Sequence, residues 1–467
     1  MSNPQNRRTA QTTMYLMKQI IVPVVSTIFL THILFGILPC FAVDVTILDY
    51  GASVEAENNA AAIQKAIDDC AEQGGGTVHV PSGTFVTGSL VLRSHVTLNL
   101  HTQATLKGTT NHPADYPKRS FIFAEEIENA GIVGNGTIDG MGDHRNFQFG
   151  DGKGGRPHLV RFRRCRNMTV KEVTLKNSAA WTLNLFHCDG VTVRGIHLYS
   201  HGNHNNDGID IDSKNVVISD CRIDCSDDAV CFKSSDPKFI VEHVVVSNCI
   251  IASNCNAIKF GTASFGGFRN IAVSNCVIRA ASENNIHHWQ EKLRVTAATT
   301  NISGIALEVV DGGTMDRIVI SNISMQNIQT PIFIRLGSRT NQPGILKNVV
   351  ISGVTATSES LMSSIISGIP EHFVENITLR DIILSSPGGG TKMDAERIVP
   401  ENIKGYPENR MFGDSLPAYG LYVRHARNIV LDNVQCYSVT PDERPAFLFL
   451  DTENILRNNV PEKPAVP

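Results

Sequence analysis

The sequence predicts an all-β fold, a right-handed parallel β-helix (a solenoid) with a capping helix at its N-terminal end. Three observations predict it. Short apolar strings recur along the chain, Gly and Asn punctuate the gaps between them, and no gap reads as a good amphipathic helix. Because the parallel strands of a βαβ protein need helical crossovers, the absence of such helices favours a coil with several strands per turn.

The repeat consists of nine strings in which Val and Ile alternate with polar residues. The strings begin at Met168, Val191, Val216, Val244, Ile271, Ile318, Val349, Ile377 and Ile429. Most successive starts lie 23 to 31 residues apart, and the two longer steps, of 47 and 52 residues, are expected to hold an extra coil or a loop. The alternation is typical of strands with one buried face, and Gly and Asn suit turns with left-handed backbone. A β-propeller, the main competing repeat fold, would have longer blades and antiparallel hairpins.

The segment Ala60–Cys70 is predicted to be the capping helix, because an open solenoid end would leave an unpaired edge. Its apolar residues fall roughly on one helical face: Ala61, Ile63, Ala66, Ile67 and Cys70. Three glycines at 74–76 are then expected to end the helix.

The first 42 residues are predicted to be a secretory signal peptide. Three basic residues precede an apolar run over 20–38, and a small-residue cut site ends at Ala42. An uncleaved anchor is the alternative, because a run of this length can just span a bilayer. The remainder, 43–467, is expected to be a single β-helix catalytic domain that is monomeric, secreted or periplasmic, and without a stable membrane partner.

Composition narrows the classes of partner and cofactor. The net charge is −4 and no strongly basic block occurs, so nucleic acid is not an expected partner. Nothing in the sequence resembles a zinc, haem or nucleotide site, and no metal or other cofactor is expected. Cys221, Cys249 and Cys276 fall at the same place in the repeat, which favours stacked free thiols over disulfides.

Three aspartates are the candidate catalytic residues: Asp207, Asp227 and Asp228. Asp207 and Asp227 are 20 residues apart, close to one coil of the repeat, so we expect them on neighbouring rungs of one face. Hydrolysis of a glycosidic bond needs one carboxylic acid to protonate the leaving oxygen and one carboxylate to activate water or attack. Like charges held close together raise at least one pKa, which keeps a proton available. Asp210 and Asp212 are interpreted as residues that cap turns.

Two groups of motifs resemble a known family. The strings ILDYGASVEAENN at 47–59 and GGGTVHVPSGTF at 74–85 resemble the N-terminal opening of the pectate-lyase-like β-helix superfamily. NNDGIDID (Asn205–Asp212) and SDDAVCFKSS (Ser226–Ser235) resemble the two active-site motifs of glycoside hydrolase family 28, the polygalacturonase family. The resemblance implies hydrolysis of a plant-type pectic polysaccharide or oligosaccharide with inversion of configuration.

The resemblance also implies roles for residues of these motifs. Asp227 would be the general acid, and Asp207 and Asp228 would activate water. Asn205, which opens the first motif, is expected to contact the substrate. Lys233 either balances the acidic cluster or is a solvated strand residue, and the sequence leaves both interpretations open.

One stretch departs from the family pattern at the position of a histidine. The family carries G-H-G before a strand in I-G-S, and the aligned stretch here begins with Asn256 in place of the histidine. Lys259 stands where a small residue is usual. Both are expected to line the substrate site.

A second departure concerns the R-I-K strand with which the family grips a galacturonate carboxylate. Here Ala306 and Glu308 replace the two cations. Glu308 would repel an anionic sugar in a partly desolvated cleft, so a neutral deoxysugar such as rhamnose is expected there. Alternatively, Lys259 and Arg335 supply the positive charge, or they form buried ion pairs with Glu308 or Asp311 that only hold rungs together.

Four further residues are candidates for the cleft. Tyr419 and Trp289 are expected to border it, and Tyr419 would offer a stacking face to a sugar ring. His201 and His204 flank the first motif and either bind sugar hydroxyls or are surface histidines.

The sequence therefore predicts a hydrolase that acts on the rhamnogalacturonan side of pectin, with a plain polygalacturonase as the alternative. A β-helix lyase or epimerase is a further alternative, but a lyase wants an Arg or Lys base. A non-catalytic carbohydrate-binding β-helix would have no need of three aspartates on adjoining rungs.

Overall fold

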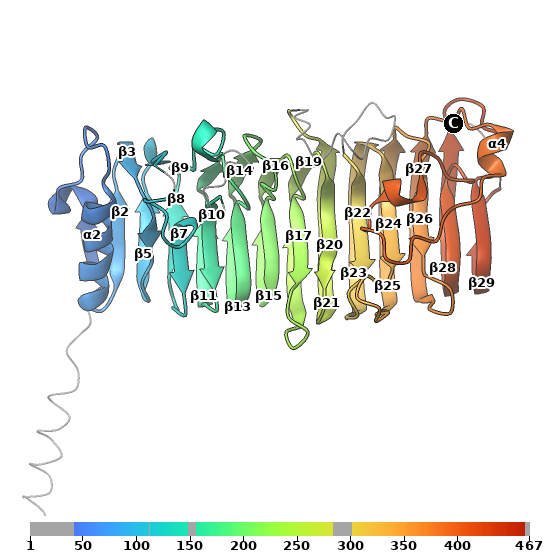
Figure 1. The fold of residues 1–467 in the computed structure, drawn as a ribbon, viewed down its shortest axis with the longest axis horizontal. Helices are drawn as coiled ribbons and strands as arrows, with labels where there is room; N and C mark the ends of the chain where they lie inside the picture. The colour runs from blue at the N-terminus through green and yellow to red at the C-terminus, as the bar shows by residue number, and fades with distance from the viewer. Residues whose placement is uncertain (1–41, 112, 148–155, 284–300, 463–467) are drawn as a thin grey trace, which may run out of the picture. The chain divides into compact units, whose positions relative to one another are not determined.

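The computed structural model describes residues 42–111, 113–147, 156–283 and 301–462. Residues Asp44–Pro467 form one compact unit, and its strands coil into a parallel β-helix (Figure 1). The predicted signal peptide, except its last residue, and Trp289 lie outside the described residues. None of the described helices has the length and apolar character that a bilayer crossing requires.

The strands stack into three parallel sheets. The first contains β4 (Leu90–Val91), β7 (Ser120–Glu125), β10 (His158–Arg163), β13 (Leu183–Arg194), β15 (Ile209–Ser219), β17 (Val230–Ser234), β20 (Asn256–Ser264), β22 (Ser303–Val309), β24 (Thr330–Leu336), β26 (Ser364–Ser367), β28 (Leu421–Ser438) and β29 (Phe447–Asn458).

The second sheet contains β1 (Val43–Thr46), β2 (Gly76–Val80), β5 (Val96–Leu100), β8 (Gly131–Gly134), β11 (Arg166–Lys171), β18 (Val241–Ser247), β21 (Gly267–Ala280), β23 (Thr314–Ile328), β25 (Ile345–Ser358) and β27 (Val374–Ser386), with the later parts of β13, β15, β28 and β29. The third contains β3 (Gly83–Thr87), β6 (Ala104–Gly108), β9 (Thr137–Asp139), β12 (Thr174–Lys176), β14 (His197–Ser200), β16 (Arg222–Cys225) and β19 (Ile250–Ser253), followed by the ends of the long strands.

The predicted repeat is confirmed as one register of the second sheet. The first residue of each of the nine strings pairs with the first residue of the next, from Met168 with Val191 to Ile377 with Ile429. Ile271 pairs directly with Ile318, and Ile377 with Ile429. Neither long step therefore holds an extra coil.

The longer of the two steps includes residues 387–420, between β27 and β28, and this segment is named the covering loop. It contains a short helix, α4 (Lys392–Ala395), and a 3-10 turn, η4 (Asn409–Phe412). Two more 3-10 turns, η2 (Ile47–Tyr50) and η3 (Arg145–Phe147), lie in the N-terminal part of the chain.

The interior is filled by stacked apolar side chains, and the turns by asparagines. Cys221, Cys249 and Cys276 are buried free thiols in one stack, as the repeat predicts. Asn275 and Asn322 have positive φ, and the side chain of Asn322 donates to that of Asn275 at 3.1 Å. Asparagine tolerates this left-handed conformation at low cost, so it can stack from rung to rung at the turns.

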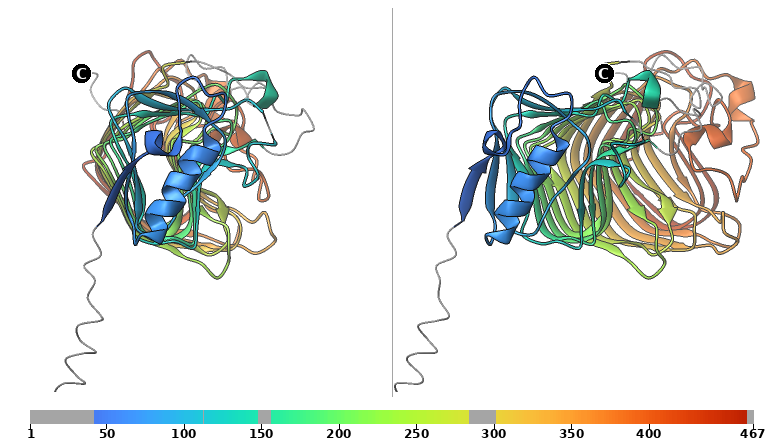
Figure 2. Two further views of the ribbon diagram at one scale, coloured as in Figure 1. Left: turned by 90° about the vertical axis from the view of Figure 1, so that its left-hand side faces the viewer. Right: turned by 60° about the vertical axis from the view of Figure 1, so that its left-hand side comes forward.

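The predicted cap is confirmed as α2 (Ala60–Glu72), which lies across the N-terminal end of the coil (Figure 2). Ile63, Ala66, Ile67 and Cys70 are buried against the first rungs. Ala61, which was predicted to lie on the same face, is exposed, because at about 100° per residue it lies on the opposite side of the helix from Ala66 and Cys70.

Candidate active site

The predicted aspartates meet on the first sheet, near the middle of the coil where β15, β17 and β20 lie (Figure 1). The Gly208 N–H donates to the Asp228 carbonyl at 2.9 Å, and the Ala229 N–H donates to the Asn256 carbonyl at 2.9 Å. Asp207, Asp228 and Asn256 therefore occupy the same position on three consecutive rungs. A Cβ on Gly208 would lie 2.4 Å from the Ala229 carbonyl oxygen, so only glycine allows this approach.

Two lysines hold the carboxylates. The Lys233 Nζ lies 3.2 Å from Asp207 Oδ2 and 3.1 Å from Asp210 Oδ1. Of the two interpretations of Lys233, the structure thus places it on the acidic cluster. The Lys259 Nζ lies 3.1 Å from Asp228 Oδ2. The Lys259 side chain is 2% exposed and that of Lys233 is 13% exposed. Because little water reaches these groups, their positive charges stabilise the ionised carboxylates strongly.

Asp227 and Asp228 differ in their surroundings although they are adjacent in sequence. Asp228 accepts from Asn256 Nδ2 at 2.7 Å as well as pairing with Lys259, so each of its oxygens has a donor. Asp227 accepts from the Asp228 N–H at 2.8 Å and from Asn205 Nδ2 at 3.5 Å. No cation forms an ion pair with Asp227 in the part of the chain that the structure describes.

This difference separates their pKa values. Burial, together with the charges of Asp207 and Asp228, raises the pKa of Asp227 well above its ordinary value. Burial also acts to raise the pKa of Asp228, but Lys259, Lys233 and the Asn256 amide outweigh it and hold that pKa below the ordinary value. Asp227 is therefore the carboxyl that retains a proton, and Asp228 is the one that stays ionised.

Asp207 and Asp210 complete the cluster. Burial raises the pKa of Asp207, and Lys233 opposes the shift. Asp210 was interpreted as a turn cap, but it is fully buried on the first sheet and paired with Lys233. The interpretation holds for Asp212, which accepts from the Ser235 N–H at 3.1 Å.

Arg156 adjoins the acid and was not a sequence candidate. It donates to Asn205 Oδ1 at 3.1 Å and to the Ala179 carbonyl at 2.9 Å, and Asn205 in turn contacts Asp227. Arg156 follows a glycine-rich stretch with no periodic pattern, so no sequence signal singled it out.

The two histidines near the first motif are buried and not on the surface. His201 lies 3.0 Å from Ser226 Oγ through Nδ1 and 2.8 Å from Asp224 Oδ1 through Nε2. It thereby joins the segment before Asp207 to the segment before Asp227.

Glu308 is not on an open surface. The side chain is buried, and neither carboxylate oxygen has a hydrogen-bond partner among the described residues. Burial raises its pKa to about 8, against an opposing effect of Lys259. The expectation that Glu308 directly faces a sugar therefore does not fit this structure, and Lys259 pairs with Asp228 and not with Glu308.

Replacing Glu308 with Gln is expected to stabilise the protein relative to wild type. This gain in stability should grow as pH rises from about 4.5 to about 8. The unfolded chain loses this proton near the ordinary value of 4.5, and the folded chain only near a pKa of about 8. The stability from protonated Glu308 is thus complete below the unfolded pKa and lost as pH rises through the folded pKa. The gain should exceed about 1 kcal/mol at pH 8, since one pKa unit corresponds to about 1.4 kcal/mol.

Urea unfolding at pH 5 and pH 8 measures this difference. Glu57→Gln, at an exposed position, is the matched control. An equal change in both variants between the two pH values would contradict the assignment.

Arg335 and Tyr419 are not brought to the aspartates. Arg335 is fully buried and donates to Ser367 Oγ at 2.8 Å and to the Glu401 carbonyl, in the covering loop, at 2.9 Å. Tyr419 precedes β28, which is five pairing steps from β17, or about 24 Å along the sheet.

The covering loop explains why Arg335 is buried. A second apolar cluster joins the outward face of the first sheet to this loop: Ala306, Phe333, Met362, Ile365, Val399, Phe412, Leu416 and Tyr422. From β22 onward, the face that continues from Lys259 is therefore covered by the chain itself.

Tyr406 of the covering loop is a second residue that the sequence did not single out. Its hydroxyl lies 3.4 Å from Lys259 Nζ, and the lysine lies 5.4 Å from its ring centroid. About half of the residue is exposed, so the ring offers a surface beside the carboxylates. No local pattern marks it, because only the fold of the loop brings it to Lys259.

The cluster could also offer ligands to a metal ion. Single ligand atoms of Asp207, Asp228 and Cys231 lie within 4.8 Å of one another. The ammonium groups of Lys233 and Lys259, however, already lie at 3.1 to 3.2 Å from these carboxylates. Because they supply the positive charge, the donor set fits a lysine-neutralised acid site better than a metal site.

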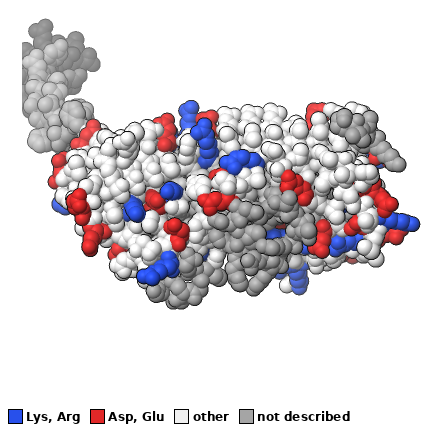
Figure 3. Space-filling model, turned by 90° about the horizontal axis from the view of Figure 1, so that it is seen from above, with Lys and Arg blue, Asp and Glu red and all other residues white. Residues whose placement is uncertain are grey.

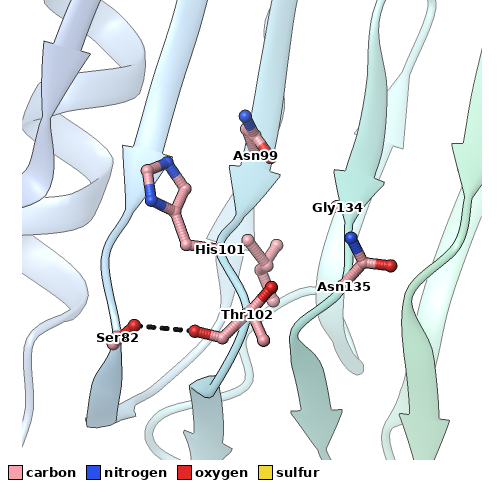
Figure 4. Close-up of a pocket in the computed structure, with 7 residues that line it drawn as sticks. Ser82, Asn99, His101, Thr102, Gly134 and Asn135 are labelled. Atoms are coloured by element: carbon pink, nitrogen blue, oxygen red, sulfur yellow. Dashed lines mark hydrogen bonds between the residues drawn. The ribbon is translucent and has the colours of Figure 1, made fainter.

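A separate hollow lies on the N-terminal rungs. It is lined by small and polar residues: Ser82, Asn99, Leu100, His101, Thr102, Gly134 and Asn135 (Figure 4). It contains none of the candidate acids. Elsewhere on the described surface, basic and acidic side chains are interspersed among uncharged ones on the face seen in Figure 3.

Comparison with known proteins agrees with the sequence motifs. A probable polygalacturonase of Vitis vinifera is 26% identical over 285 residues, which cover 54% of this chain and 58% of the relative. A probable rhamnogalacturonase A of Aspergillus oryzae is 27% identical over 268 residues, 56% of this chain and 52% of the relative. The chain thus spans about half the length of the curated relatives it matches.

Solved structures share the fold. A hyperthermoactive exopolygalacturonase from Thermotoga maritima aligns with a TM-score of 0.67 at 22% identity, over 85% of this chain and 92% of that one. A family 28 exopolygalacturonase from Yersinia enterocolitica aligns with a TM-score of 0.68 at 18% identity, over 89% and 78%. These neighbours confirm the right-handed β-helix. Residues 70–403, more than half of the chain, match glycosyl hydrolases family 28, and the chain belongs to this family.

Proposed function

We propose that the protein is a secreted or periplasmic hydrolase that cleaves glycosidic bonds in a pectic polysaccharide. The observation that carries the proposal is a pair of adjacent buried aspartates with different partners: Asp228 is bound by Lys259 and Asn256, whereas Asp227 has no ion-pair partner among the described residues. Their pKa values are accordingly shifted in opposite directions. Asp227 would give its proton to the leaving glycosidic oxygen. Asp228 and Asp207 would orient a water molecule and accept its proton as it attacks the anomeric carbon.

Inversion of configuration is part of the proposal. The family resemblance implies it. The nearest ligand oxygens of Asp227 and Asp228 lie within 4.8 Å, shorter than the roughly 6.5–9.5 Å that is usual between the carboxyl groups of inverting enzymes. NMR of the anomer that forms first therefore tests inversion, and an initial product of retained configuration would contradict it.

The lysines argue against a lyase or epimerase. Such an enzyme needs an Arg or Lys that can accept a proton. Lys233 and Lys259 are both paired with aspartates. Burial acts to lower the pKa values of the two lysines, but the charges of these aspartates, and that of Cys231 beside Lys233, hold both values well above the ordinary value. Neither is suited to act as a base.

The sugar on the side of β22 is proposed to be uncharged, which favours a rhamnogalacturonan-type linkage over a plain galacturonan. Ala306 and Glu308 stand where the family has cations, Lys259 is paired with Asp228, and Arg335 is bonded to the covering loop. None of these described residues is left to bind a uronate there. A polygalacturonase remains the alternative.

The covering loop supports action at a chain end. It buries the outward face from β22 to β28, so a polysaccharide has no open path along that face beyond Tyr406. A groove closed on one side accommodates a terminal segment and not the middle of a long chain.

Incubation of the purified protein with polygalacturonate and, separately, with rhamnogalacturonan tests these statements together. We expect saturated short products from rhamnogalacturonan by mass analysis, with little early fall in viscosity. Cleavage of polygalacturonate instead would select the alternative substrate, and a rapid fall in viscosity would contradict action at a chain end. Products with a ring double bond would refute hydrolysis.

A further inference from the structure

The outward face of the first sheet carries an arginine group on the N-terminal side of the carboxylates. Arg161 and Arg163 alternate on β10, and Arg119 directly precedes β7, the strand that pairs with β10. Burial lowers the pKa of Arg161, and the neighbouring charges of Arg163 and Arg119 lower it further. The positive charges of Arg163 and Arg119 therefore act on the Arg161 guanidinium.

Among the described residues, no close ion pair compensates the positive charge of these arginines. Arg161 Nε donates to the neutral Asn184 side chain at 3.2 Å, and neither Arg161 nor Arg119 forms an ion pair in the described part of the chain. Arg163 lies 3.5 Å from Glu125, which is held more tightly by Arg164 at 2.8 Å. The Nε of Arg163 is buried without a partner among the described residues. Arg161 and Arg163 are half-buried and Arg119 is exposed, and cations with this little compensation are suited to bind an anion.

The arginine group is continuous with the catalytic cluster. Arg161 pairs with Asn184, and Asn184 pairs with Asp210, so Arg161 lies two rungs, or about 10 Å, from the acidic cluster in the same outward row. Aromatic rings accompany it. Phe123 on β7 pairs with Arg161 on the neighbouring strand β10, and the ring centroid of Phe186 lies 5.4 Å from Arg163 Cζ. Arginine forks beside aromatic faces are suited to a sugar ring that bears a carboxylate.

The opposite side of the cluster has the reverse character. Beyond Lys259 the row continues with Ala306 and Phe333 under the covering loop, and Glu308 is the nearby titratable group without a partner. The face is thus cationic on the N-terminal side of the aspartates, whereas on the other side Lys259 and Arg335 already have partners.

We propose that Arg161, with Arg119 and Arg163, binds the carboxylate of a uronic-acid residue of the substrate on the N-terminal side of the aspartates. The bond that is cut then joins an acidic sugar segment on this side to an uncharged sugar on the side of β22. This inference rests on the proposed function, because it assigns subsites to the same active site.

A purely structural role is the competing explanation. If Arg161 only holds β10 to β13 through Asn184, its loss would lower stability and would affect every substrate equally. Substrate charge therefore distinguishes the two roles.

The experiment compares kcat/KM for an acidic pectic oligosaccharide and for the same oligosaccharide after reduction of its carboxylates to alcohols. Arg161→Gln is expected to lose about 10-fold to 100-fold on the acidic substrate, the range for a hydrogen bond to a charged group, and less than about twofold on the reduced one. Arg161→Lys should retain part of the acidic preference. Arg166→Gln, an exposed arginine in β11, is the matched control and should not change either value.

An equal loss on both substrates, or no loss on either, would overturn the inference. Should the wild type cleave neither substrate, the proposed function fails, and the inference is then tested by calorimetric binding of the uncleaved acidic oligosaccharide. Weaker binding by Arg161→Gln than by Arg166→Gln would support the anion site, and equal binding would refute it.

Discussion

Replacing Asp227 with Asn is expected to lower kcat by about 10³-fold or more while the fold and substrate binding persist. The amide is isosteric with the carboxyl group but cannot donate an acidic proton to the leaving oxygen, and general acid catalysis alone contributes about 10²–10⁴-fold. Asp227 forms no ion pair with a described residue, so the substitution breaks no charge pair. The stability of the protein should not fall. Burial and the neighbouring negative charges already disfavour the ionised form of this carboxyl group, and the substitution removes the group.

The control is Asp220→Asn, which changes an exposed aspartate at a turn that follows β15. Activity of this variant should stay within about twofold of wild type. Turnover by Asp227→Asn at the wild-type rate would rule out Asp227 as the acid. Loss of activity together with an altered circular dichroism spectrum would call for Asp227→Glu, which should recover part of the rate.

The opposite pKa shifts also set the pH dependence of kcat/KM. Activity should rise with pH as Asp228 and Asp207 ionise, and fall at higher pH as Asp227 loses its proton. Because the pKa of Asp227 is raised well above its ordinary value, the alkaline limb should lie above the usual range of a carboxyl group. In Asp227→Asn the alkaline limb should disappear from the residual activity.

The fold was predictable because its determinants are local and periodic. The strings that begin at Met168 and Ile429 alternate with period two, and a rung length repeated along the chain leaves one consistent register. The meeting of the aspartates followed from the same reasoning, although the predicted spacing aligned Asp207 with Asp227 and the structure aligns it with Asp228, one residue further along. One detail of the cap was wrong: Ala61 lies within α2 but on the face opposite to Ala66 and Cys70, because residues five and nine positions apart fall on opposite sides of a helix.

The surroundings of the site were not predictable to the same extent. Glu308 and Arg335 lie on β22 and β24 of the first sheet and are fully buried, and Arg335 is bonded to the covering loop. The loop packs through contacts such as Phe412 with Phe333, which are 79 residues apart and have no sequence period. Tyr406 reaches Lys259 for the same reason, so the sequence could not distinguish it from other tyrosines.

Replacing Lys259 with Met is expected to have the second largest effect, and the acid limb of the pH profile reveals it. Lys259 is a positioning residue: its Nζ lies 3.1 Å from Asp228 Oδ2, and it is the largest of the influences that hold the pKa of Asp228 below its ordinary value against burial. Without the ammonium group, the effect of burial should raise the pKa of Asp228. We expect kcat/KM to fall by roughly 10²-fold near neutral pH, with the acid limb moved to higher pH.

Removing one partner of a buried pair typically costs about 3–5 kcal/mol of stability, so Lys259→Met is expected to melt at a lower temperature than wild type. Lys259→Arg keeps the charge and should keep the acid limb near its wild-type position even if its activity is reduced. This contrast separates the electrostatic role from packing, since both substitutions disturb the contact with Tyr406. An acid limb that is unchanged in a folded Lys259→Met variant would show that Asn256, which donates to Asp228 Oδ1 at 2.7 Å, suffices to keep Asp228 ionised.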